Sequence, residues 1–564
     1  MNLKSIFSVV ALSALMVGCS SDDLTNEPGA VETPAGVSET GYLNVCINLP
    51  AVNARDARSN ANDQFADGTA DEYAVKCAHL VIFNTDDETD PEAKIEGVFQ
   101  FNNLKPWNTD GTSTDNVTTK AESVVKVQVP VPAAGKKLGA LVVLNDDNFD
   151  SHFGVGMSLK SFFEEKERLC NLANMKNSNG FLMMNAPLYI NGTAKTLVSV
   201  DKTDLCKSEN EARNKTALEV YVERGVAKVT MTTTADIADK SKVTIEGEDK
   251  PYVATILNWA LDITNKKTYL IRNVKNFDTW KAFPTTYNAR FFSETSKRIY
   301  WCEDPNYDFT PLTAEDKATW VTEQFDKLAS TDAITNTLNQ SVYVLENTFN
   351  VKNQYRYQTT RAIIKASFAP EGEEPADFYT IGTARKIYDK AGMQEFIKGK
   401  AISLFADKND KNKYKFADLT SVSQTGGTHT IEVGDISYNT VGTTYVDLTA
   451  EEVGKLNDVI GEINTFKDGI CYYVARIKHF GDDLTPLAEN DIIYGDEPTA
   501  SHKFLGRYGI VRNNWYELQV SAIKTLGHPT IPDAPNTPDD EKDFYISFKV
   551  NIHSWAKRVQ NVIL

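Results

Sequence analysis

The chain has 564 residues, which is too long for one ordinary hydrophobic core and predicts two domains. Hydrophobic residues make up 41% of the chain, which is enough to fill such cores. Its net charge of −18 argues against a nucleic-acid partner, because an acidic surface repels phosphates.

The first residues have the composition of an export signal. After a short basic start, Ile6 to Val17 is apolar, too short to span a bilayer but right for a signal peptide. The residues that lead to Cys19 resemble the lipobox of bacterial lipoproteins, although Met16 departs from the usual leucine. We expect a signal peptide at 1–18 and a lipid, palmitate included, on Cys19. The alternative is an ordinary signal peptide with a chance cysteine.

A short alternating stretch follows a polar leader. Every second residue from 43 to 49 is apolar: Leu43, Val45, Ile47 and Leu49. Strict alternation is typical of a strand with one buried face. The stretch closes at Pro50, and two arginines follow, Arg55 and Arg58. We interpret this strand as removable.

Strand-like runs then recur through the first half of the chain. They are Gly41 to Pro50, Ala74 to Asn84, Lys94 to Phe101, Ser123 to Pro130, Leu138 to Asn145, Phe181 to Ile190 and Ala217 to Met231. Short strands separated by turn residues predict a β-sandwich, with one helix expected at Leu159 to Met175. A polar stretch at 232–249 suggests the domain boundary. We therefore expect a propeptide at 19–55, an N-terminal sandwich at 56–240 and a C-terminal sandwich at 241–564.

The second half repeats this pattern with larger insertions. Its expected strands are Tyr252 to Thr264, Lys267 to Ile271, Gln340 to Glu346, Thr360 to Phe368, Asp377 to Ile381, Gly469 to Ile477 and Trp515 to Leu526. Helices are expected at Thr313 to Asn339 and Glu451 to Phe466. The predicted fold class is all-β, with two sandwich domains and a few inserted helices.

The chain ends in a second alternating stretch. Gly527 to Asp543 is rich in proline and acidic residues, a composition that predicts an extended linker. After it, apolar residues alternate at Phe544, Ile546, Phe548, Val550 and Ile552, and the tail stays apolar at Val562 and Leu564. We interpret this end as a strand that can replace the removable one. Which half of 544–564 would be donated stays open.

No catalytic, metal or cofactor site is indicated. The 7 histidines are scattered without ligand spacing, and no nucleophile elbow or phosphate-binding loop occurs. The 7 cysteines lack the close spacing of a disulfide framework or a zinc site. We therefore expect no enzyme activity, no cofactor and no metal.

Three stretches carry a family resemblance. Glu223 to Val229, Glu-Arg-Gly-Val-Ala-Lys-Val, resembles a strand of the Bacteroidales fimbrillins. Arg507 to Tyr516 is similar to their Val-Arg-Asn-Asn strand, and Val550 to Trp555 resembles the C-terminal end of the minor-fimbrium shaft subunit. Together with the lipobox and Tyr42 to Arg55, these motifs occur in the order of a type V pilus shaft subunit.

The resemblance implies two transthyretin-like sandwiches and assembly by strand exchange. An outer-membrane lipoprotein precursor would be cut by an arginine-specific protease, at Arg55 or secondarily at Arg58, and would lose its first strand. The C-terminal strand of an identical subunit would fill the groove. Accessory tip and anchor pilins and host or bacterial receptors would be further partners in a cell-surface fimbrium that supports adhesion and virulence.

The sequence is also compatible with other functions. A surface glycan-binding lipoprotein is permitted by the 7 tryptophans and 23 tyrosines, but has no need of a tethered terminal strand. An anchored enzyme is disfavoured because no acid, base or nucleophile set converges. An anchor or tip pilin would share the fold. The arginines and the long terminal strand favour the shaft.

Overall fold

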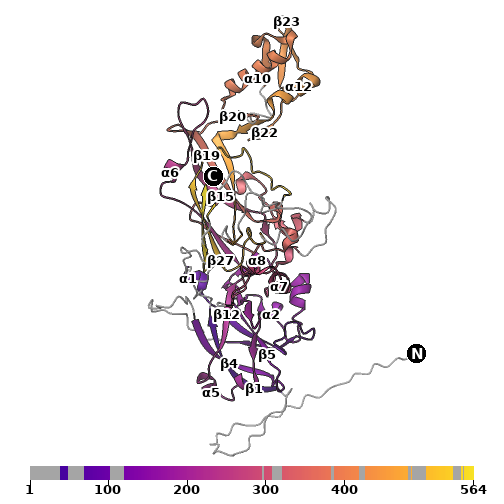
Figure 1. The fold of residues 1–564 in the computed structure, drawn as a ribbon, viewed down its shortest axis with the longest axis vertical. Helices are drawn as coiled ribbons and strands as arrows, with labels where there is room; N and C mark the ends of the chain where they lie inside the picture. Colours follow the sequence, from indigo (N-terminus) through magenta and orange to yellow (C-terminus); the bar gives the residue numbers. More distant parts are fainter. Residues whose placement is uncertain are drawn as a thin grey trace, which may run out of the picture.

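The computed structural model describes most of the chain. These residues are 38–48, 69–101, 120–294, 297–307, 321–382, 386–417, 426–480, 484–485 and 504–537, with the backbone of 548–549, 552–554 and 556–563. They form an elongated molecule, with the N-terminal half at one end and an inserted subdomain at the other (Figure 1). The predicted all-β class, with sandwich units and few helices, is confirmed.

The N-terminal half is built on an eight-stranded sheet that curls around its own core. Its order is β3 (Ile95–Gln100), β2 (Ala78–Phe83), β5 (Leu138–Leu144), β8 (Met183–Asn185), β12 (Leu218–Arg224), β1 (Ser38–Asn48) and β4 (Lys120–Pro130), with β11 (Val198–Val200) beside β5. The outermost strands β3 and β4 contact each other, so the sheet closes around apolar side chains from alternate positions.

Short helices cover the outer face of this sheet. Every residue of β5 is buried, because α2 (Phe149–His152) and α3 (Ser161–Glu164) place Phe149 and Phe162 on its outer side. The single helix expected at Leu159 to Met175 is wrong. Two short α-helices occur instead, α3 and α4 (Leu172–Met175), because the Asn171 side chain caps the Asn174 amide and starts a new helix.

The chain passes to the second sandwich within the run expected as one strand, Ala217 to Met231. β12 ends at Arg224, and β13 (Ala227–Thr233) pairs instead with strands of the C-terminal half. The domain boundary expected near residue 240 stays a prediction, although the strands already change sheets at 225–226.

The C-terminal half has two facing sheets. One has the order β18 (Ser341–Val344), β13, β27 (Asn514–Ala522), β30 (Ala556–Ile563) and β28 (Phe548–Lys549), with β29 (Ile552–Ser554) beside β30. The other is β14 (Lys242–Val243), β15 (Tyr252–Asp262), β19 (Arg361–Pro370) and β26 (Ile470–Arg476). Buried side chains of β13, β19, β26 and β27 form the shared core.

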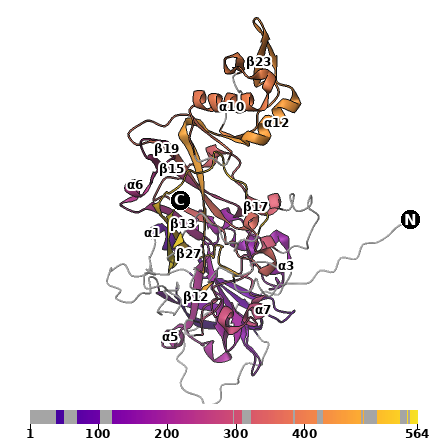
Figure 2. The same cartoon turned by 45° about the horizontal axis from the view of Figure 1, so that its top comes forward.

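A subdomain is inserted between β20 (Phe378–Ile381) and β25 (Ile463–Phe466) and projects from the end of the molecule (Figures 1 and 2). It contains helices α10 (Lys390–Leu404) and α12 (Ala450–Ile460) and the strands β21 (Tyr414–Phe416), β23 (Ile436–Val441) and β24 (Thr444–Asp447). The helix expected at Glu451 to Phe466 ends early, because Gly461 adopts a φ of 72° and β25 follows.

Two further expectations are wrong. Lys267 to Ile271 is no strand, because only Thr268 forms a bridge, to Cys170. The helix expected at Thr313 to Asn339 is reduced, over its described residues, to one turn at 321–324 and a short 3-10 helix at Thr331–Ala333, with β17 (Phe325–Asp326) between them.

Candidate functional site

The first strand lies inside the N-terminal sheet. β1 pairs antiparallel with β4 from Ser38↔Pro130 to Asn48↔Lys120. On its other side it runs parallel to β12, from Val45↔Leu218 to Asn48↔Tyr221. Its apolar face is fully buried at 0% exposure: Leu43, Val45 and Ile47. Without β1, β4 and β12 would each lose a neighbouring strand, and the core would open as a groove.

Side chains and a short bridge also hold β1 in place. Tyr42 and Cys206 exchange two backbone hydrogen bonds, at 2.9 and 3.0 Å. Asn44 Nδ2 donates to the Lys215 carbonyl at 3.1 Å, and the Asn48 amide donates to Glu219. The sequence did not single out Cys206, because a bridge to a residue so far along the chain leaves no local pattern.

The end of the chain folds back onto its own second sandwich. β30 runs parallel to β27, from Asn514↔Ala556 to Val520↔Val562. Phe548 in β28 and Ile552 in β29 belong to short segments that pair antiparallel with β30. In this structure the backbone of the outer half, Ala556–Ile563, is therefore paired within the same chain.

Several predicted site residues lie outside the described residues. They are Cys19, Leu49, Arg55, Arg58, Phe544, Ile546, Val550 and Leu564. Lipidation, cleavage and strand donation therefore stay predictions.

The motif residues meet where the two sandwiches join. In a first cluster, Glu72 Oε1 lies 2.8 Å from Lys228 Nζ and accepts a hydrogen bond from the Tyr343 hydroxyl at 2.5 Å. Arg224 Nε donates to the Glu72 carbonyl at 2.7 Å, and its Nη1 donates to Asn513 Oδ1 at 3.1 Å. Residues of both motifs, Glu223–Val229 and Arg507–Tyr516, thus meet in one buried cluster.

A second buried cluster continues across the junction. Glu223 Oε2 lies 3.2 Å from Arg272 Nη1, and Arg272 Nε lies 3.6 Å from Glu346 Oε2. Arg512 Nη2 lies 2.5 Å from Glu346 Oε1 and donates to Thr268 Oγ1 at 2.7 Å. Burial alone would raise the pKa of the Glu346 carboxyl, but Arg512 and Arg272 hold it below its ordinary value. The charged motif residues therefore connect the two sandwiches.

The described residues contain no group of His, Cys, Asp and Glu side chains that could hold a metal ion. Nor does any helix among them have the length and apolar character needed to cross a membrane.

The fold and the site define an all-β protein of two sandwiches whose first strand fills a slot between two others. Residues 464–561 match the family described as "Major fimbrial subunit protein type IV, Fimbrillin, C-terminal", and the matched segment includes Arg507–Tyr516. The resemblance to the fimbrillins is thereby confirmed for this C-terminal segment.

Comparison with solved structures gives more distant similarities. A fimbrial assembly protein from Parabacteroides distasonis has 12% identity and a TM-score of 0.28, over 62% of this chain and 85% of that chain. The tip fimbrial protein Mfa3 from Porphyromonas gingivalis, with C-terminal truncation, has 14% identity and a TM-score of 0.24, over 60% and 84%. These values are too low to carry a functional conclusion. No curated protein sequence matches the chain significantly.

Proposed function

We propose that this chain is a structural shaft subunit of a cell-surface fimbrium, without enzyme activity, which polymerises by protease-triggered strand exchange. The observation that carries the proposal is the position of β1. It is buried between β4 and β12, and the chain that follows it leads to Arg55 and Arg58. Cleavage after either arginine would separate β1 from the rest of the fold.

Loss of β1 would create a strong binding site for another strand. Two sheet edges and a row of apolar positions would become accessible together, and a strand of the right alternation satisfies both. The C-terminal stretch of a neighbouring subunit has that alternation at Phe544, Ile546 and Phe548. A joint of this kind would bury on the order of 1,000 Å² and dissociate slowly.

The precursor would reach the outer membrane through a lipid on Cys19. Labelled palmitate should enter the full-length chain in its host, whereas Cys19→Ala should remain unlabelled. Equal labelling of both proteins would contradict lipidation.

The test of assembly is limited cleavage of the purified full-length chain with an arginine-specific protease. We expect a new N-terminus at Asp56, or at Ser59 for the second site, followed by a ladder of polymers in electrophoresis without boiling and filaments in electron micrographs. Arg55→Ala/Arg58→Ala should stay monomeric, and Arg213→Ala, an exposed arginine elsewhere, should polymerise normally. Polymers from the uncleavable variant, or cleavage that leaves only monomers, would contradict strand exchange. An anchor or tip pilin would give that second result.

A further inference from the structure

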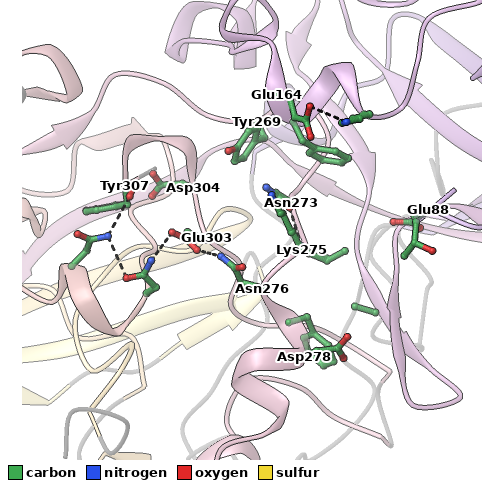
Figure 3. Close-up of a pocket in the computed structure, with 18 of the residues that line it drawn as sticks. Glu88, Glu164, Tyr269, Asn273, Lys275, Asn276, Asp278, Glu303, Asp304 and Tyr307 are labelled. Carbon is green, nitrogen blue, oxygen red and sulfur yellow. Dashed lines mark hydrogen bonds and ion pairs between the residues drawn. The ribbon is translucent and has the colours of Figure 1, made fainter. Parts of the chain in front are cut away.

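A cavity lies where loops of the N-terminal half meet the segments 269–307 and 350–358 of the C-terminal half (Figure 3). Its volume is about 1160 Å³. This is slightly larger than the volumes of about 300–1,000 Å³ that are typical of small-molecule sites. Glu88 and Glu164 contribute from one side, and Asn273, Asn276 and Tyr307 from the other. The space accommodates a ligand longer than a single ring.

Aromatic side chains form part of the walls. Phe163 and Tyr355 are half-buried, so part of each ring can meet a ligand. Tyr269 is 6% exposed and packs edge-on against Phe163, with 6.1 Å between the ring centroids. Tyr357 is 8% exposed, and its ring centroid lies 5.7 Å from that of Tyr355. Because buried rings support them, the two partly exposed rings are held as fixed platforms.

Carboxamide groups also line the cavity. The Glu303 carboxylate accepts hydrogen bonds from the Asn276 amide and from Asn350 Nδ2, the latter at 2.8 Å (Figure 3). Asn350 Oδ1 in turn accepts from Asn353 Nδ2 at 3.3 Å. These contacts fix the orientation of the amides before any ligand binds.

One buried polar atom at the cavity lacks a hydrogen bond. Gln358 is 1% exposed and lines the cavity, and its Oε1 has no partner among the described residues. Its Nε2 donates to the Tyr357 hydroxyl at 3.0 Å, which fixes the amide. A buried acceptor without a donor costs about 1–3 kcal/mol, and a hydroxyl group of a ligand would satisfy it.

The charges of the lining exclude an anionic ligand. Among the described residues that line the cavity, Asp278, Glu164 and Glu303 are opposed by two lysines, and one of them, Lys160, lies 3.5 Å from Glu164 Oε2. The net local charge is negative, so sulfated, phosphorylated or sialylated molecules would be repelled.

We propose that this cavity binds a neutral oligosaccharide. Aromatic rings pack on the C–H faces of sugars, and oriented amides and carboxylates exchange hydrogen bonds with their hydroxyls. A neutral chain of sugar units also fits the volume and the charge. The shaft subunit would then carry its own adhesive site, separate from the β1 slot and independent of strand exchange.

The test uses the uncleaved full-length chain, so that it does not depend on polymerisation. Saturation-transfer NMR is measured with maltotriose, N-acetylchitotriose and lacto-N-tetraose as neutral probes. Sialyllactose is the anionic probe, and trilysine tests for a cationic peptide instead. At least one neutral saccharide should bind, with saturation concentrated on its C–H protons.

Two variants in the cavity and one control locate the binding. Tyr355→Ala and Asn273→Ala should each weaken binding about tenfold. Tyr445→Ala, 42% exposed on β24 in the distal subdomain, should bind as the unaltered chain does. Thermal unfolding confirms that each variant is folded, and Asn273→Ala decides the matter if Tyr355→Ala does not fold.

Four outcomes would overturn the proposal. They are the absence of binding by every neutral saccharide at millimolar concentration, stronger binding of sialyllactose, binding of trilysine alone, and unchanged binding in Asn273→Ala.

Discussion

Replacing Arg512 with methionine should destabilise the junction of the two sandwiches strongly. Its Nη2 lies 2.5 Å from Glu346 Oε1, 2.7 Å from Thr268 Oγ1 and 3.0 Å from the Tyr269 carbonyl. The side chains of Arg512 and Glu346 are only 3% and 1% exposed. Methionine fills much of the space of the arginine stem but leaves the carboxylate of Glu346 without its nearest cation.

The magnitude follows from burial. Removing one partner of a buried ion pair costs about 3–5 kcal/mol, because the other charge stays desolvated. We expect the lower part of this range, since Arg272 Nε remains 3.6 Å from Glu346 Oε2. The same change at an exposed pair should cost about 0–1 kcal/mol. Arg213→Met is the matched control, because Arg213 pairs with Glu209 at 63% and 55% exposure.

The assay is urea unfolding of each variant, followed by tryptophan fluorescence and circular dichroism. Arg512→Met/Glu346→Gln should be more stable than the sum of the two single changes predicts, because the unpaired charge is gone. Unfolding of Arg512→Met at the same urea concentration as Arg213→Met, or simple additivity in the double variant, would show that Arg512 and Glu346 do not form a stabilising buried ion pair.

The pH dependence of this comparison gives an independent check. In the unaltered chain the pKa of Glu346 is lowered, so its contribution is present above the pKa of the unfolded state and is lost as pH falls through the folded one. Without Arg512, burial should raise that pKa, and the carboxyl should take up a proton in mild acid. The stability difference between the two proteins should therefore shrink as pH falls from 7 toward 4.

Three further predictions concern single sites. His152 donates from Nδ1 to Asp146 at 2.8 Å; burial alone would lower its pKa, but this contact raises it to about 10. The stability it contributes should be complete below about pH 6.5 and lost as pH rises toward 10, and His152→Gln should remove that dependence in unfolding curves. Gly509 has a φ of +136°, and a Cβ added there would lie 2.7 Å from a backbone oxygen. Gly509→Ala should therefore lower the free energy of unfolding in urea by about 1–3 kcal/mol. Gly454→Ala is the control and should not lower it, because the space around Gly454 is open. The Thr449 hydroxyl caps α12 by accepting a hydrogen bond from the Glu452 backbone amide at 3.3 Å. Thr449→Ala should therefore lower the free energy of unfolding by about 1 kcal/mol, and an unchanged melting temperature would contradict this.

The elements that the sequence predicted well have a local signal. The alternation at Leu43, Val45 and Ile47 is enough to predict β1 and its buried face, because a strand places every second side chain on one side. The strand expected at Trp515 to Leu526 corresponds to β27, which ends four residues earlier, at Ala522. Helix α10 was missed, because glycines at 392 and 399 interrupt its pattern.

The parts that the sequence did not predict depend on distant contacts. Glu72 and Tyr343 meet across the junction although they are far apart in the chain. Phe163 and Tyr355 are also far apart in the chain, yet both line the same cavity. The charged residues of the two motifs could be recognised as a family pattern, but their role at the junction becomes visible only when both sandwiches are in place.

The position of β1 between β4 and β12 limits which strands can replace it. β1 has one parallel neighbour, β12, and one antiparallel neighbour, β4. A strand entering in either direction would therefore meet one neighbour of each kind, and backbone pairing alone would not select its direction. Side chains must decide, because a shift by one residue would bring polar groups into a core that now holds Val45 and Ile47.

The last prediction distinguishes the two halves of the C-terminal stretch. We expect the inner half to be donated, because Phe544–Ile552 alternates strictly and its described segments pair with β30 at the edge of the sheet. The backbone of Ala556–Ile563 instead pairs with β27 inside that sheet. Val550→Asp should abolish polymers after cleavage, because a carboxylate in the groove costs several kcal/mol, while Val550→Ile should retain them. Deleting Lys557 to Leu564 should instead lower the melting temperature of the uncleaved monomer, because β27 loses a neighbour. Polymers from a folded Val550→Asp chain, or a deletion that abolishes polymers without changing the melting temperature, would reverse the assignment of the two halves.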